Sequence, residues 1–123
     1  MTCGFPQRHM LAIDPRGSGN VTKSHVRWRT RKDPSYVPSP VSIGKYFVVV
    51  SDSGRASCLE AETGRLAWNE RIGREHGASA VTVQGHVCFV SESGIMTVIK
   101  PGEEYAEVAK NELGEEMHAS PVI

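Results

Sequence analysis

The chain has 123 residues, of which 39% are hydrophobic and 23% charged, a composition that suits one globular domain at most. Its 14 basic and 14 acidic residues cancel, so the chain lacks the strong net charge typical of nucleic-acid or membrane-surface binding. No apolar run reaches the roughly 18 residues that a membrane-spanning helix needs, which argues against direct membrane insertion.

The charge is unevenly spread along the chain. Residues 1–33 carry a net charge of +5 and residues 101–123 a net charge of −5. Arg27, Arg29 and Arg31 alternate, so they would share one face of a strand. No nucleic-acid recognition motif surrounds them, and we interpret this face as solvated. The first ten residues contain no apolar signal-peptide core, which leaves the compartment unknown.

In chain order, residues 1–9 are expected to be an N-terminal extension, and residues 10–33 to form two strands separated by a long loop at Arg16–Ser24. Residues 38–73 contain four short strand signals rich in Val, Ile, Tyr, Phe and Trp. These signals are Ser39–Ile43, Tyr46–Ser51, Arg55–Ala61 and Leu66–Arg71. Residues 78–115 repeat the four strands, and residues 119–123 begin the pattern again.

The repeat has a period of 40 residues. The stretch "SPVSIGKYFVVVSDSG", residues 39–54, aligns without a gap with "SAVTVQGHVCFVSESG", residues 79–94. Trp28 and Trp68 are also 40 residues apart, and the next equivalent position holds Val108. Residues 103–116 have the highest helix propensity of the chain, but their place in the repeat favours a strand.

Turn residues separate the strands. Gly54 and Gly94 end Ser-Asp/Glu-Ser-Gly turns, in which glycine supplies a positive φ and the Asp52 side chain can bond the backbone. Thr63 and Gly64 close the turn before the strand that carries Trp68. Each of these residues therefore has a structural explanation.

Four strands in a repeat of this length predict an all-β fold, a fragment of a β-propeller built from four-stranded antiparallel blades. A small β-sandwich is the alternative, which the ungapped repeat disfavours. Trp28 and Trp68 would then be large anchors that pack between neighbouring sheets.

The stretch "CLEAETGRLAW", residues 58–68, resembles the repeat of pyrroloquinoline-quinone-type β-propellers, in which Thr-Gly is followed four residues later by Trp. Quinoprotein dehydrogenases have this repeat, as does the outer-membrane assembly propeller of the bacterial Bam complex. The resemblance covers residues 10–123 and implies that Thr63, Gly64 and Trp68 are blade-motif residues. It also implies a periplasmic or cell-envelope location.

The resemblance implies no catalytic residue, cofactor ligand or metal ligand in this chain. Dehydrogenases of this superfold hold a quinone and a metal ion in the central channel, often under a pair of adjacent cysteines. Here Cys3, Cys58 and Cys88 are isolated, and none of Asp14, Asp33 and Asp52 corresponds to a catalytic base. We therefore expect no cofactor and favour a protein that is not an enzyme; part of a quinone-dependent alcohol or sugar dehydrogenase is the alternative.

The predicted strands make a half blade at 10–33, blades at 38–73 and 78–115, and the first strand of a further blade at 119–123. Propellers usually close with about four to eight blades. The favoured interpretation is therefore a piece of a larger propeller that serves as a scaffold and binds protein partners or missing blades. A homo-oligomer joined through the oppositely charged ends is the alternative. The loops Arg16–Ser24 and Gly73–Gly77 could contact partners.

Overall fold

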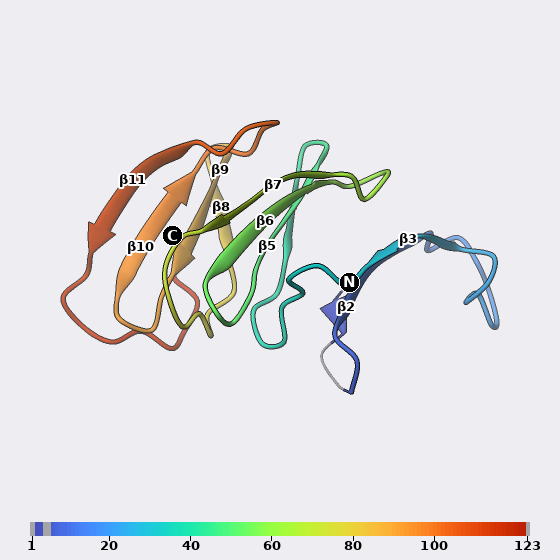
Figure 1. Cartoon of the computed structure of the whole chain (residues 1–123), viewed down its shortest axis with the longest axis horizontal. Helices are drawn as coiled ribbons and strands as arrows, with labels where there is room; N and C mark the ends of the chain where they lie inside the picture. The colour runs from blue at the N-terminus through green and yellow to red at the C-terminus, as the bar shows by residue number, and fades with distance from the viewer. Residues whose placement is uncertain (1, 4–5, 123) are drawn as a thin grey trace.

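The computed structural model describes residues 2–3 and 6–122, and within them every regular element is a β-strand. Eleven strands form three antiparallel sheets that stand side by side (Figure 1). The strands are β1 (Thr2–Cys3), β2 (His9–Ile13), β3 (Val26–Thr30), β4 (Val41–Ile43), β5 (Tyr46–Val50), β6 (Arg55–Glu60), β7 (Leu66–Arg71), β8 (Val81–Val83), β9 (His86–Val90), β10 (Ile95–Ile99) and β11 (Glu107–Glu112).

The second and third sheets have the same topology. Their orders are β4-β5-β6-β7 and β8-β9-β10-β11, with each strand antiparallel to the next along the chain. These are the two four-stranded units predicted from the repeat. Strand β11 lies within residues 103–116, where repeat position outweighs helix propensity because the segment pairs along β10.

The first sheet has three strands in the order β1-β2-β3. Strands β2 and β3 are the two expected within residues 10–33, joined by the long loop between them. Strand β1 lies in the segment expected to be an extension, where Thr2 pairs with Met10 and Cys3 with His9. Such a two-residue strand is too short to leave a pattern in the sequence.

Residues 119–122, expected to start another strand, are not in a strand in the structure. A first strand is defined by its pairing with the second strand of its own sheet, and the described residues supply none beyond Val122. Ser120 still occupies the repeat position, because its Oγ accepts a hydrogen bond from the Ser79 backbone N–H at 3.0 Å.

The hydrophobic core lies between the sheets. Val48 and Val50 of β5 point toward the third sheet, where they join a cluster that includes Val87 and Phe89. Val49 points the other way and packs with Met10 of the first sheet. The middle sheet is thus buried on both faces, which explains why β5 reads as an uninterrupted apolar run. Sheets stacked face to face in this way are the blades of a propeller.

Candidate functional site

The two tryptophans join neighbouring blades. Trp28 Nε1 on β3 donates a hydrogen bond to the Ala61 carbonyl of the second sheet at 2.8 Å. Trp68 Nε1 on β7 donates in the same way to the Gly102 carbonyl of the third sheet at 3.1 Å. Each indole also meets an aromatic ring of the following blade edge-on, Phe47 at 5.9 Å and Tyr105 at 5.1 Å between centroids. Each tryptophan therefore links its own blade to the next blade along the chain, a contact we call a Trp–carbonyl latch. We call the contact between the first and second sheets the first junction, and that between the second and third sheets the second junction.

The Thr63–Gly64 turn packs against Trp28 of the preceding blade. Gly64 has a φ of +74°, and a Cβ built on it would lie 2.6 Å from Trp28 Cδ2. The indole ring therefore occupies the space that any side chain would need. Thr63 stabilises the turn internally, because its hydroxyl donates to Glu60 Oε2 at 2.8 Å and accepts from the Arg65 backbone N–H at 3.2 Å.

Strand pairing corrects one equivalence inferred from the sequence. Cys58 pairs with Trp68, and the residue 40 positions after Cys58, Val98, pairs with Ala109. Ala109 and not Val108 is therefore the counterpart of the tryptophan. Counting 40 residues forward from Trp68 gives the wrong position because the β10–β11 connection, residues 100–106, is longer than the β6–β7 connection, residues 61–65.

Gly54 and Gly94 provide close approach between chain segments as well as a positive φ. Their φ values are +83° and +74°, and a Cβ on Gly54 would collide with the backbone of Gly73, as one on Gly94 would with that of Glu115. The segment that leaves each blade therefore crosses directly over this glycine. Backbone bonds from Ile72 and Leu113 to these glycine carbonyls hold the crossing, at 3.0 and 2.8 Å.

Asp52 serves a different partner from the one expected. In its turn, Ser51 Oγ accepts the Arg55 backbone N–H at 3.1 Å. The Asp52 carboxylate instead accepts the backbone N–H groups of Tyr36 at 2.8 Å and Val37 at 3.1 Å. It thereby fixes the loop that joins the first and second sheets, a role that sequence spacing alone did not reveal.

A cluster of charged residues links the second and third sheets beside the β4–β5 and β6–β7 turns. Glu103 of the third blade accepts hydrogen bonds from Arg65 at 2.7 Å and Tyr46 at 3.0 Å, and pairs with Lys45 at 3.2 Å. These donors, with Arg65 first, lower the pKa of Glu103 to about 2. The sequence offered no signal for this cluster, because its members are distant along the chain.

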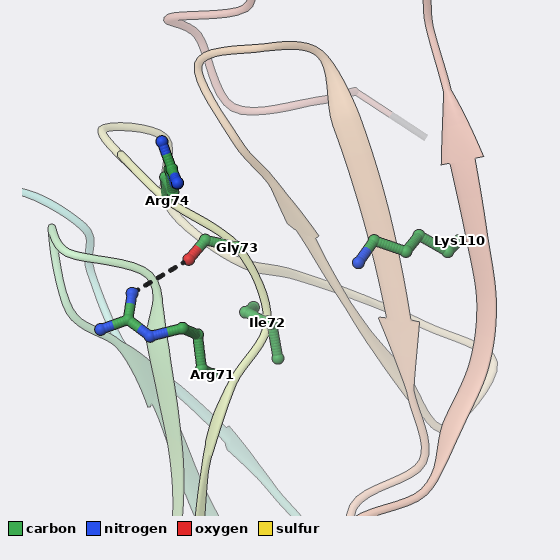
Figure 2. Close-up of a pocket in the computed structure, with 5 residues that line it drawn as sticks. All are labelled: Arg71, Ile72, Gly73, Arg74 and Lys110. Carbon is green, nitrogen blue, oxygen red and sulfur yellow. Dashed lines mark hydrogen bonds between the residues drawn. The ribbon is translucent and has the colours of Figure 1, made fainter.

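An open hollow of about 440 Å³ lies beside the second junction, between β7 and β11. Its lining residues are Arg71, Ile72, Gly73, Arg74 and Lys110. Figure 2 shows that the three cationic side chains point in different directions, with Arg71 bonded to the Gly73 carbonyl at 3.3 Å. The cations do not converge on one point, so this hollow lacks the geometry of a built anion site.

The described residues also give no geometry for covalent or metal chemistry. No three His, Cys, Asp or Glu side chains within them lie close enough to share a metal ion. Cys58 and Cys88 are buried free thiols, and burial raises the pKa of Cys58 to about 11, so it stays protonated at neutral pH. Cys3 has a side chain outside the described residues.

Exposed groups suited to partner contact lie on loops as well as on strands β2 and β11, which expose Ile13 and Val108. Of the two loops expected to contact partners, Gly73–Gly77 crosses between the second and third blades and buries His76. Loop Arg16–Ser24 forms a local turn in which Asn20 Oδ1 accepts bonds from Thr22. A third loop, Asp33–Pro38, exposes Tyr36 and Val37. Sequence reasoning missed it, although a Tyr-Val pair between two prolines was a visible signal.

Radial four-stranded blades joined by Trp–carbonyl latches define a β-propeller of quinoprotein-like repeats. The sequence model of the family described as "Outer membrane protein assembly factor BamB" matches residues 9–110, and the chain belongs to this family. The comparison with curated proteins gives no match. Among the described residues, no helix has the length and apolar character needed to cross a bilayer.

Solved structures agree on the fold. The chain is similar to BamB from Moraxella catarrhalis, with a TM-score of 0.71 and 18% identity over 90% of this chain and 32% of that one. It is also similar to a europium-containing methanol dehydrogenase, with a TM-score of 0.69 and 12% identity over 89% of this chain and 22% of the other. It is also similar to a quinohemoprotein alcohol dehydrogenase from Pseudomonas putida HK5, with a TM-score of 0.61 and 17% identity over 94% of this chain and 18% of that one. The chain spans about a third of the length of the BamB structure, and a smaller share of the two dehydrogenases.

Proposed function

We propose that this chain is part of a non-catalytic propeller scaffold that binds protein partners through its inter-blade loops. One observation carries the proposal: loop Asp33–Pro38 holds two large apolar side chains, Tyr36 and Val37, in solvent on a fixed backbone. Exposed aromatic and aliphatic groups on a rigid loop are typical of protein-binding surfaces. Membership of the BamB family supports the same role.

The motif residues of the repeat have structural partners in neighbouring blades. Trp28, Trp68 and Gly64 join blades, and Asp52 fixes a loop. By family membership we also infer a location in the bacterial cell envelope, with further blades or partner chains covering the outer face of the third sheet. On that sheet Val108 is 55% exposed.

Part of a quinone-dependent dehydrogenase is the second candidate, favoured by the likeness of the fold to two alcohol-oxidising enzymes. The residues described do not fit a quinone and its metal ion. The first strands β4 and β8 contact each other across the sheets. β4 carries Ser42 between Val41 and Ile43, β8 carries Thr82 between Val81 and Val83, and neither strand carries a carboxylate.

A pair of measurements separates the two candidates. A photo-crosslinking amino acid would be placed at Val37, and as a control at Val122, in cells that express the protein with its natural flanking sequence. The scaffold proposal expects discrete protein adducts from position 37. Titration of the same purified protein with pyrroloquinoline quinone and Ca²⁺ should leave tryptophan fluorescence unchanged. Saturable quenching without adducts would contradict the proposal.

Self-assembly is a separate proposal, based on the net charges of +5 and −5 at the two ends of the chain. Under it, copies would associate head to tail through a heterologous interface. Sedimentation of the folded chain at low and high salt tests this, since an association held by charge weakens with salt. A single monomeric species at all concentrations would contradict it.

A further inference from the structure

Loop Asp33–Pro38 holds two adjacent exposed residues between buried ones. Pro34, Ser35 and Pro38 are buried, whereas Tyr36 is 55% and Val37 59% exposed. Two adjacent large apolar side chains in water forgo the hydrophobic stabilisation that burial would give. The loop therefore presents this pair outward.

The backbone under the pair is fixed from three sides. The Asp52 carboxylate accepts the N–H groups of both exposed residues, and Ser35 Oγ donates to the Pro38 carbonyl across the loop. At the entrance of the loop, Asp33 accepts a hydrogen bond from Asn69 Nδ2 at 2.9 Å. A loop that is already ordered loses little conformational entropy on binding, which is the main advantage of a preorganised surface.

Positive charge borders the apolar pair. The Arg8 guanidinium lies over the Tyr36 ring at 5.4 Å from its centroid, a cation–π arrangement that leaves its N–H donors available at the rim. A second exposed cation, Arg74, lies on the segment whose backbone approaches Gly54, two residues after Asp52 in the same turn. The carboxylates of Asp52 and Asp33 are already engaged, with the loop backbone and with Asn69.

We propose that Tyr36, Val37, Arg8 and Arg74 form a docking surface for an extended segment of a protein partner in which aliphatic or aromatic side chains alternate with carboxylates. The apolar pair would cover the partner's apolar side chain, and the two arginines would pair with its carboxylates. This inference rests on the proposed function and deepens it by naming the chemistry of the partner.

The probe is a short fluorescein-labelled peptide with a Leu-Phe pair flanked by aspartates, titrated against the full chain by fluorescence anisotropy. Two matched peptides serve as controls, one with lysine in place of aspartate and one with glycine in place of Leu-Phe. We expect saturable binding of the first peptide only, weakened by added salt.

Replacement of Tyr36→Ala or Val37→Ser should weaken this binding about tenfold or more, and Arg8→Glu should weaken it and reduce its salt dependence, with Arg74 still available to the peptide's carboxylates. Val108→Ser is the control, since Val108 is equally exposed but lies on β11. Circular dichroism melts identify any variant that fails to fold, and Arg8→Glu, at an exposed position, still tests the proposal in that case.

Equal binding of the lysine peptide, or unchanged affinity in the Tyr36 and Val37 variants, would overturn the inference. So would self-association that Tyr36→Ala removes, because the surface would then belong to a second copy. A lack of peptide binding together with protein adducts from position 37 overturns only the partner chemistry. A lack of both, with saturable quinone binding, overturns the proposed function itself.

Discussion

The two junctions between blades use the same backbone framework for different purposes. In the first, Tyr36 is exposed and its N–H donates to the Asp52 carboxylate. In the second, the residue 40 positions later is His76, which is 2% exposed and whose N–H donates to the Asp52 carbonyl at 3.0 Å. One junction therefore presents a side chain to solvent, and the other locks a side chain between blades.

The difference shows how a repeat protein separates stability from recognition. The Trp–carbonyl latches recur at both junctions because every pair of blades needs them. The glycine crossings recur where the chain leaves the second and third blades. The side chain at Tyr36 or His76 is not needed for blade packing in the same way, since the turn that contains Asp52 accepts the backbone N–H of either residue. A loop position of this kind can diversify without loss of the fold.

The largest expected effect is that of Trp68→Ala, which tests whether the second junction is the tighter one. Trp68 is 7% exposed and donates to Gly102 across the blades. Its truncation should lower the free energy of unfolding by about 3–5 kcal/mol. Trp28→Ala, at a half-buried indole, should cost less when both are measured by urea denaturation. A larger loss for Trp28 would reverse the comparison.

Gly64→Ala tests the first junction from the other side. The new Cβ would collide with the Trp28 ring and the residue would keep a positive φ, so we expect a loss of about 2–4 kcal/mol. Gly44→Ala is the matched control, because its φ is +56° but open space surrounds it. Thermal melts that place the two variants together would show that the indole contact contributes nothing.

Asp52→Asn separates loop order from blade packing. An amide can accept only part of what the carboxylate accepts, so we expect a loss of about 1–2 kcal/mol. Hydrogen exchange should become faster at Tyr36 and Val37, with little change at His76, whose N–H bonds to the backbone carbonyl of Asp52. The control is Glu92→Gln, since Glu92 contacts loop Gly73–Gly77 through its backbone N–H. Uniform acceleration at both loops would contradict this division.

The smallest effect concerns pH and belongs to the second junction alone. Burial lowers the pKa of His76 from 6.5, opposed by the Arg74 carbonyl and the Glu92 charge, and within the described structure Nδ1 has no hydrogen-bond partner. A lowered pKa means that the unfolded chain takes up the proton first, so the stability due to neutral His76 is present above about pH 6.5 and is lost as pH falls.

The free energy of unfolding should therefore decrease on acidification below pH 6.5 in the wild type, and less steeply in His76→Gln. Tyr36→Phe is the control and should follow the wild type. Parallel pH profiles for wild type and His76→Gln would show that His76 does not cause the pH dependence of stability.

Much of the fold was predictable because its determinants are local. Alternating and continuous apolar runs mark strands, and glycines such as Gly54 and Gly64 mark turns with a positive φ, so the period and the sheet order followed from short windows. The candidate site was predicted less well. Loop Gly73–Gly77 was named, but the exposed pair in Asp33–Pro38 was not, because exposure depends on what the other blades cover.

The sequence by itself determined an all-β repeat, the strand positions of the second sheet to within two residues, and the repetition of those strands in the third sheet. Only the tertiary structure decided which residues meet across them: Trp28 with Gly64, Asp52 with Tyr36, Glu103 with Tyr46. It also decided that Ala109 replaces the tryptophan of the third blade and that β1 extends the first sheet. Strands arise from neighbours along the chain, whereas contacts between blades join residues in different repeats, and no local pattern encodes those partners.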